Sequence, residues 1–355
     1  HAISSVSISC QGEIFSLAPL HNQSLLAFVK KEQKTNWVGI LNFEADTIHG
    51  FCVENRSATN LCSNSNGSII VSVTNQSASK ASNVLALLQD GSFDEIFVCD
   101  GIVTLPRFSN SDSYLYSISR DGKSTQLFSY DVREKVHKQL TKGDYFDIPV
   151  FRLSDGTSFF WRASWFGHSS PIASSRWHGW RLLSLNSSNE ISEHTEEFYD
   201  QPFTIISHNE KYIIYEYCDN IYIKEMGKEC SFIPIPMNKM NISGYDSPPM
   251  YAYAPSISPC SKYIAVAASE KEPLGDIAKS NIFLVDTSDF SWRQITTENS
   301  NIRETCFSSD GKSIYFTKKE AYNVPVAIWR VSLDTLVIDS IDIDKEGICL
   351  TEIQL

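Results

Sequence analysis

The sequence predicts an all-β fold built from seven copies of one four-stranded antiparallel sheet. The first observation is a phrase at residues 306–316 in which Ser309-Asp310-Gly311-Lys312 supplies residues that tolerate unusual backbone angles, so that it reads as strand, tight turn and strand. The second is that this phrase recurs. By subtraction, the positions that match Lys312 lie 44 to 54 residues apart, at Gln23, Ser68, Ser113, Thr157, Lys211 and Lys262.

A third observation is that the units also share a second half. Asp131 and Asp286 each close a strand, and a strand with the pattern Gln-(Leu/Ile)-Thr ends ten residues later, at Thr141 and Thr296. A unit is therefore expected to run as strand a, an Asp-Gly-Lys-like turn, strand b, a variable loop, strand c, an Asp-led turn and strand d.

One such sheet exposes two faces and two edges, so seven are expected to stack radially around a channel. The predicted fold is thus a seven-bladed β-propeller that forms a single domain over residues 1–355. A β-sandwich pair also contains short alternating strands and remains the alternative. Seven units in phase, each near the roughly 40–50 residues typical of a blade, favour the propeller.

The units can be placed in order along the chain. Their expected ranges are 11–53, 54–99, 100–143, 144–198, 199–246, 247–298 and 299–345. Residues 3–10 and 348–354 alternate between apolar and polar side chains, as strands do. We expect these terminal strands to lie side by side and to close the ring in one shared blade, which would remove exposed sheet edges.

The repeats resemble those of a known family. Residues 307–316, and residues 256–266 with the half that contains Asp286, resemble the repeats of TolB-type propellers, also called WD40-like or PD40 repeats. The resemblance covers nearly the whole chain, although units 1, 2 and 5 depart from the Ser-Pro-Asp-Gly-Lys consensus. It implies a propeller but no single activity, because the family includes periplasmic binding scaffolds, propellers appended to prolyl-oligopeptidase-type hydrolases and metal-dependent oligogalacturonate lyases.

Composition narrows the classes of partner. The formal net charge is −12, from 30 basic and 42 acidic residues, which argues against nucleic acid as the main ligand. No apolar run is long enough to span a membrane, and we expect a monomer. The nine Cys include no Cys-x-x-Cys pair, which favours free thiols in the cytoplasm. A periplasmic or secreted protein whose signal peptide has been removed is the alternative.

The long connections between strands are expected on one face of the propeller. The a–b and c–d turns are short, whereas the b–c and d–a connections include residues 162–179, 237–252 and 269–280. Binding groups concentrate on loops that a rigid scaffold holds. The functional face is therefore predicted on this side, over units 4 to 6.

The fourth unit carries the densest group of candidate binding residues. Aromatic rings can stack on sugars or other flat ligands, and Arg pairs with carboxylates. An insertion that merely covers its own Trp side chains is the alternative, and Trp161 and Trp180 are expected in strands b and c. The candidates are Arg162, Trp165, His168, Arg176, Trp177 and His178.

A second group is expected where each strand a starts, at the mouth of the channel. Mixed acidic, basic and amide side chains there could bind a polar ligand, although a polar, hydrated channel is the alternative. The residues at these positions are Asn60, Thr104, Asp147, Gln201, Tyr253, Arg303 and Glu304, of which Asp147, Gln201, Tyr253 and Arg303 are the principal candidates.

The sequence indicates no metal or cofactor site. Carboxylates alternate over residues 339–347 and could gather around Ca²⁺, but a strand followed by a turn gives the same pattern. The chain has no Gly-x-Ser-x-Gly elbow, no His-Glu-x-x-His, no glycine-rich phosphate loop and no His-x-His cluster.

A full repeat set without a catalytic motif predicts a non-catalytic module that binds a protein, peptide or glycan over units 4 to 6. Whether the chain is an enzyme stays open at this stage. The alternative is a polysaccharide lyase, in which an Arg neutralises a uronate carboxylate while a His or Tyr removes the α-proton. The candidates for those roles are Arg162, Arg176, Arg303, His168, His178 and Tyr253.

Overall fold

A computed structural model of the chain describes most of its strands and many of the turns between them. The described residues are 3–4, 13–19, 25–31, 36–42, 47–53, 56–63, 69–75, 82–87, 93–108, 113–119, 123–168, 175–207, 209–226, 228, 230–233, 249–270, 279–297, 299–319, 327–341 and 349–353. This part of the chain contains β-strands and no helix, so no helix within it could cross a membrane.

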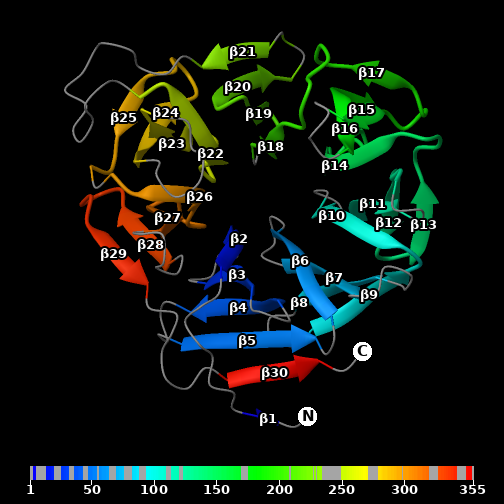
Figure 1. Ribbon diagram of the computed structural model, residues 1–355, viewed down its shortest axis with the longest axis horizontal. Helices are drawn as coiled ribbons and strands as arrows, with labels where there is room; N and C mark the ends of the chain where they lie inside the picture. Colours follow the sequence, from blue (N-terminus) through cyan, green and yellow to red (C-terminus); the bar gives the residue numbers. More distant parts are fainter. Residues whose placement is uncertain are drawn as a thin grey trace. The chain divides into compact units, whose positions relative to one another are not determined.

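The strands form antiparallel sheets, and each expected unit contains one sheet (Figure 1). The first sheet has the order β1-β30-β5-β4-β3-β2 and consists of β1 (Ile3–Ser4), β2 (Glu13–Pro19), β3 (Leu25–Lys31), β4 (Asn36–Asn42), β5 (Thr47–Val53) and β30 (Cys349–Ile353). The other six sheets have four strands each, in chain order.

Their strand bounds follow the expected unit boundaries closely. The second and third sheets are β6 (Arg56–Ser63), β7 (Ile69–Asn75), β8 (Ser82–Leu87), β9 (Phe93–Cys99), and β10 (Ile102–Phe108), β11 (Ser113–Ser119), β12 (Gln126–Asp131), β13 (Val136–Gln139). The fourth and fifth are β14 (Phe146–Arg152), β15 (Ser158–His168), β16 (Ser175–Leu185), β17 (Ile191–Glu193), and β18 (Phe203–Ile206), β19 (Tyr212–Tyr217), β20 (Asn220–Glu225), β21 (Cys230–Ile233). The last two are β22 (Tyr251–Ile257), β23 (Tyr263–Ser269), β24 (Ser280–Asp286), β25 (Trp292–Gln294), and β26 (Asn301–Phe307), β27 (Ser313–Lys319), β28 (Ala327–Ser332), β29 (Ile338–Ile341).

The chain divides into two compact units. One consists of His1–Cys52 with Phe203–Glu352, and the other of Val53–Pro202 with Ile353–Leu355. The single domain expected over residues 1–355 stays a prediction.

The two ends of the chain pair as predicted. Ile3 lies opposite Thr351 and Ser4 opposite Leu350, and β30 also pairs with β5 (Figure 1). The expected strand at residues 5–10 lies outside the described residues. The N-terminal and C-terminal strands thus share one sheet with β2 to β5.

The turn between strands a and b explains the recurring phrase. In the last sheet, the Asp310 carboxylate accepts hydrogen bonds from the Ser308 hydroxyl (2.6 Å) and the Lys312 backbone N–H (3.0 Å). The Ser308 hydroxyl oxygen in turn accepts the Ser313 backbone N–H at 2.9 Å. Gly311 has a φ of +70°, a backbone conformation that Gly adopts without strain. The Ser-x-Asp-Gly-Lys pattern therefore recurs because its Ser and Asp make the hydrogen bonds of this turn and its Gly takes the left-handed position.

The Gln-(Leu/Ile)-Thr pattern has a similar explanation. The Thr141 hydroxyl accepts the backbone N–H of Leu127, and the Thr296 hydroxyl accepts that of Ile282, both at 2.9 Å. Thr195 repeats this contact with Leu182 at 3.0 Å. In each case the Thr hydroxyl accepts a backbone N–H of strand c at the point where strand d has ended and no longer offers a backbone carbonyl.

Hydroxyl groups also join neighbouring sheets within each of the two compact units. Ser280 at the start of β24 donates to the Ser300 carbonyl and accepts the Ile302 N–H. Ser82 makes the equivalent contacts with Gly101 and Val103. Apolar clusters fill the spaces between these sheets. One lies around Val84 and Tyr116 in the compact unit that contains Val53–Pro202. Another lies around Leu284 and Phe316 in the compact unit that contains Phe203–Glu352.

Candidate ligand-binding site

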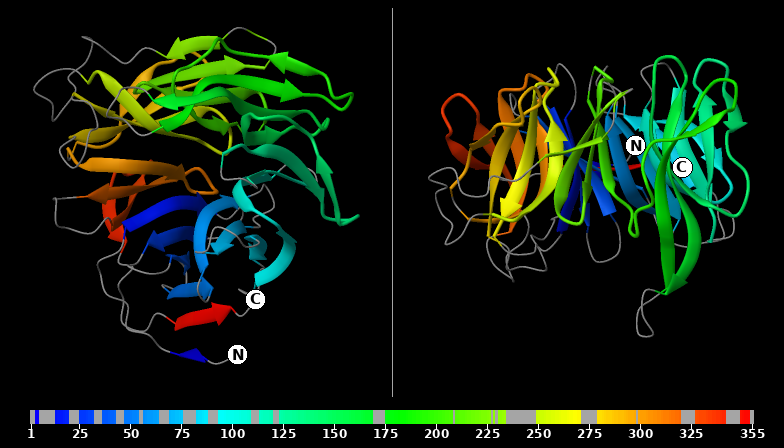
Figure 2. Two further views of the ribbon diagram at one scale, coloured as in Figure 1. Left: turned by 45° about the vertical axis from the view of Figure 1, so that its right-hand side comes forward. Right: turned by 90° about the horizontal axis from the view of Figure 1, so that it is seen from above.

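The fourth sheet carries a long hairpin that extends past its other strands. The strands β15 and β16 have eleven residues each, whereas β14 pairs with β15 only as far as Ala163. From Trp165 to His168, β15 pairs with β16 alone in the described part of the chain. Figure 2 shows this green hairpin projecting beyond the rest of its sheet. The segment expected as a loop over residues 162–179 is therefore strand up to residue 168 and again from residue 175.

The register of the hairpin separates the candidate residues onto two faces. Trp165 lies opposite His178, and Gly167 opposite Arg176. Phe166 lies opposite Trp177. Because successive side chains on a strand point to opposite sides, Trp165, Arg176 and His178 share one face, and Phe166 and Trp177 share the other. We call these the His178 face and the Trp177 face.

Three rings form the centre of the His178 face. The His178 imidazole is fully buried, and its centroid lies 4.3 Å from those of both Trp165 and Tyr199. Trp165 and Tyr199 are 42% and 44% exposed, and their planes meet at 61°. His178 Nδ1 lies 3.3 Å from the Tyr199 carbonyl oxygen, which can only accept, so Nδ1 carries the proton. In the neutral imidazole Nε2 is then an acceptor, and it has no hydrogen-bond partner among the described residues.

Charged side chains border these rings. Arg176 Nη2 lies 3.3 Å from the Asp200 carboxylate, and both side chains are about half exposed. The same carboxylate lies 3.8 Å from His178 Nδ1. Gln201 follows Asp200 and is exposed. The His178 face thus combines two accessible rings with one Arg–Asp pair whose charges cancel.

Two glycines make room for the Trp165 ring. A Cβ atom at Gly167 would lie 2.9 Å from Trp165 Cζ3, and one at Gly179 would lie 3.0 Å from Trp165 Cδ1 and Nε1. Gly179 also has a φ of +73°, which a side chain would strain. The indole therefore lies close against the hairpin backbone and is held in place there.

The Trp177 face packs on the protein itself. The Trp177 ring lies 5.6 Å from both Phe146 and Phe166, and its Nε1 donates to the Lys123 carbonyl at 2.7 Å. Trp161 and Trp180 are buried in β15 and β16, as predicted. Trp177 is therefore a packing residue in this structure, which leaves Phe166 as the exposed ring of this face.

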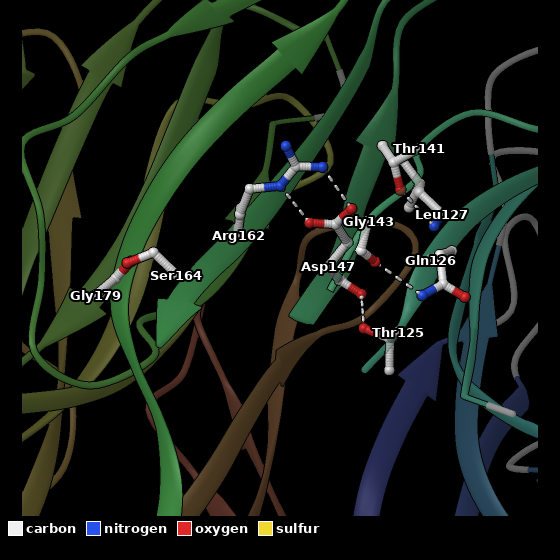
Figure 3. Close-up of polar contacts among 9 residues, drawn as sticks. All are labelled: Thr125, Gln126, Leu127, Thr141, Gly143, Asp147, Arg162, Ser164 and Gly179. Atoms are coloured by element: carbon white, nitrogen blue, oxygen red, sulfur yellow. Dashed lines mark hydrogen bonds and ion pairs between the residues drawn. The ribbon is translucent and has the colours of Figure 1, made fainter. Parts of the chain in front are cut away.

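Arg162 and Asp147 bind each other. Arg162 Nε and Nη2 each lie 2.7 Å from one carboxylate oxygen of Asp147, in a bidentate pair (Figure 3). Asp147 is buried, and its backbone carbonyl accepts a hydrogen bond from the Thr125 hydroxyl at 2.7 Å. The Arg162 guanidinium also lies 4.3 Å from the centre of the Tyr145 ring. Among the described residues, this pair leaves the two N–H groups of Nη1 and one of Nη2 outside it.

The remaining candidates lie elsewhere or cannot be placed. Tyr253 is buried in β22, and burial raises the pKa of its phenol, while the nearby Arg303 charge opposes that rise. Arg303 is exposed in β26. His168 ends β15, but its side chain lies outside the description. One compact unit contains Asp147, Gln201 and the hairpin residues, and the other compact unit contains Tyr253 and Arg303. The described residues contain no group of His, Cys, Asp or Glu that could hold a metal ion.

Three notable residues were not identified from the sequence. Tyr199 and Asp200 complete the His178 face from the segment that follows β17, and no motif marks them. Glu216 in β19 is partly buried, and its carboxylate accepts the Ala254 backbone N–H at 2.8 Å. Burial raises the pKa of Glu216 to about 7, against the lowering effect of that hydrogen bond. The only sequence signal was an acid inside an apolar strand.

Comparison with known proteins identifies the fold. No protein-family model matches the chain, and no curated protein matches its sequence. The structure does match the β-propeller domain of the trilobed protease from Pyrococcus furiosus, over 94% of this chain and 99% of that one, with a TM-score of 0.62 and 14% identity. The chain has a β-propeller fold.

Two further structural matches are enzymes. An acylaminoacyl peptidase from Pyrococcus horikoshii matches with a TM-score of 0.61 and 13% identity, over 92% of this chain and 52% of that one. An oligogalacturonate lyase in complex with manganese matches with a TM-score of 0.58 and 11% identity, over 93% and 85% of the two chains. Matches at identities this low show a shared fold alone.

Proposed function

We propose that this propeller is a monomeric, non-catalytic binding module that recognises a protein, peptide or glycan through the hairpin of its fourth sheet. The observation that carries this proposal is the pair of exposed rings, Trp165 and Tyr199, fixed around a buried His178. Rigid aromatic side chains bind ligands at a low cost in conformational entropy. The scaffold in this proposal is one domain of seven blades, closed by the pairing of β30 with β1 and β5.

The same geometry gives little support to catalysis at the hairpin. A lyase needs a cation that is free to neutralise the substrate carboxylate and a base that reaches the α-proton. Arg162 is already neutralised by Asp147, and His178 is covered by Trp165 and Tyr199. Tyr253, the other candidate base, is buried, and its raised pKa makes it a weaker source of phenolate at neutral pH.

The rival function, a polysaccharide lyase, can be tested directly. Purified protein is incubated with polygalacturonate and other uronic polymers, and absorbance in the unsaturated-uronate band is followed. We expect no turnover. Sustained turnover that is lost in Arg162→Ala or His168→Ala, in a variant whose thermal unfolding shows that it is folded, would overturn the proposal of a non-catalytic module and favour the lyase.

A further inference from the structure

We propose that the His178 face binds a neutral oligosaccharide, with Trp165 and Tyr199 stacking on its pyranose rings. This inference rests on the proposed binding function and names the ligand class. It concerns the face made by Trp165, Arg176, His178, Tyr199 and Asp200, all of which lie in one unit of the chain.

The first argument is the fixed position of the rings. Trp165 packs against the backbone at Gly167 and Gly179 and against the His178 imidazole, yet 42% of its surface stays exposed. Tyr199 packs on the same imidazole at 4.3 Å and is 44% exposed. Two apolar ring surfaces, 6.2 Å apart and inclined at 61°, suit successive sugar rings, which turn relative to one another along a chain.

The second argument is the polar chemistry beside the rings. Arg176 offers N–H donors and Asp200 offers carboxylate acceptors, so the pair can exchange hydrogen bonds with neighbouring sugar hydroxyls. Because the two charges cancel, the described residues of this face carry no excess positive charge for a uronate. The chain as a whole is acidic, at −12. Charge therefore favours a neutral glycan over an anionic one.

The third argument is the unpaired Nε2 of His178. This acceptor is buried and has no donor within the described residues. A buried polar atom without a partner is unfavourable, because it has given up its hydrogen bonds to water. A donor from a ligand bound at this face would remove that cost.

The size of the surface favours a glycan over a protein partner. Among the described residues, only Trp165 and Tyr199 are exposed large apolar side chains on this face. A stable protein interface buries about 800 Å² on each partner and involves about 20–30 residues a side. Two rings with one ion pair are a small site, comparable to the few stacking and hydrogen-bonding groups that orient a small ligand.

The test is calorimetric titration of the whole chain with cellopentaose, laminaripentaose, mannopentaose and xylopentaose, and with trigalacturonate as an anionic probe. We expect at least one neutral probe to bind and trigalacturonate to bind more weakly. Trp165→Ala is expected to weaken the neutral probe about tenfold. Phe166→Ala is the matched control, because Phe166 is an exposed ring on the opposite face of the same hairpin.

The outcomes separate this inference from the proposed function. Thermal unfolding of each variant confirms that it folds, and Trp165→Phe is expected to retain most of the binding if Trp165→Ala is unstable. No binding of any neutral probe, or an equal loss in Trp165→Ala and Phe166→Ala, overturns the glycan inference. If a peptide display library instead yields ligands whose binding needs Trp165, the binding function stands and the glycan inference is wrong.

Discussion

At the scale of single residues, the Arg162–Asp147 pair shows how a predicted binding residue can serve the scaffold instead. The guanidinium and carboxylate meet through two 2.7 Å contacts, and Asp147 is buried. Sequence alone could not reveal this pairing, because it depends on the register that places Asp147 opposite Arg162. Both residue types suit ligand binding, and only the paired strands show that each is occupied by the other.

Removing one partner of this pair is expected to destabilise the fold. Arg162→Leu would leave a buried, unpaired carboxylate at Asp147, which costs about 3 kcal/mol of unfolding free energy. Arg181→Leu is the matched control. Arg181 lies opposite Arg162 on β16, but its ion pairs with Glu193 and Glu197 are exposed and worth less than about 1 kcal/mol. Urea unfolding measures both, and equal losses would contradict this role of the pair.

Glu216 gives the fold a dependence on pH. Burial raises its pKa from 4.5 to about 7, so the folded state binds this proton more tightly than the unfolded state. The contribution to stability is full below pH 4.5 and is lost as the pH rises through 7. The loss amounts to about 3 kcal/mol. We expect Glu216→Gln to remove it, so that the wild type and the variant diverge between pH 5 and pH 8 in urea unfolding. Parallel curves would show that Glu216 is not perturbed.

At the scale of elements, the a–b turn connects sequence to structure most directly. Gly311 occupies a left-handed position with a φ of +70°, and Glu210 occupies the equivalent position of the fifth sheet with a φ of +57°. Both backbone N–H groups donate to a Ser carbonyl three residues earlier, at 2.9 Å. The fifth unit departs from the repeat consensus here, and it accepts backbone strain as a result.

Reciprocal substitutions at this turn should act in opposite directions. Gly311→Ala is expected to lower the unfolding free energy by about 1 kcal/mol, because the left-handed backbone strains a residue with a side chain. A clash is not the reason, since the added Cβ atom would lie 3.5 Å from Pro259, which is an ordinary contact. Glu210→Gly is expected to raise it by up to about 1 kcal/mol, because Gly relieves the strain. Glu210→Ala keeps the strained backbone and serves as the control. Denaturation midpoints that move in the same direction for Gly311→Ala and Glu210→Gly would contradict this explanation.

The repeat was readable from the sequence because its signals are local. The turn acid, the left-handed glycine and the hydroxyl of Thr296 each bind groups within a short stretch of chain. The hairpin was not readable, because Gly167 and Gly179 suggest a loop and in fact accommodate the Trp165 ring. Tyr199 and Asp200 reach the site through tertiary packing, which no spacing in the sequence indicates.

At the scale of the whole molecule, the pairing of the two terminal strands decides whether the propeller is a closed ring. A propeller whose last blade does not join the first keeps exposed strand edges, which favour association with other chains. The propeller domain it resembles, that of the trilobed protease, is described as having an open velcro topology. In this chain β1 pairs with β30, and β30 with β5, so we propose that the ring closes.

The most direct test of that closure is calorimetry of the double variant Ile3→Cys/Thr351→Cys, with the two new thiols oxidised to a disulfide. These residues lie opposite each other on antiparallel strands, within disulfide reach. The single variants are the controls for changes at either site alone. A closed ring predicts one cooperative transition for the whole chain, raised by roughly 5–10 °C on cross-linking. Two transitions, with the larger one unmoved by the disulfide, would contradict the closed propeller.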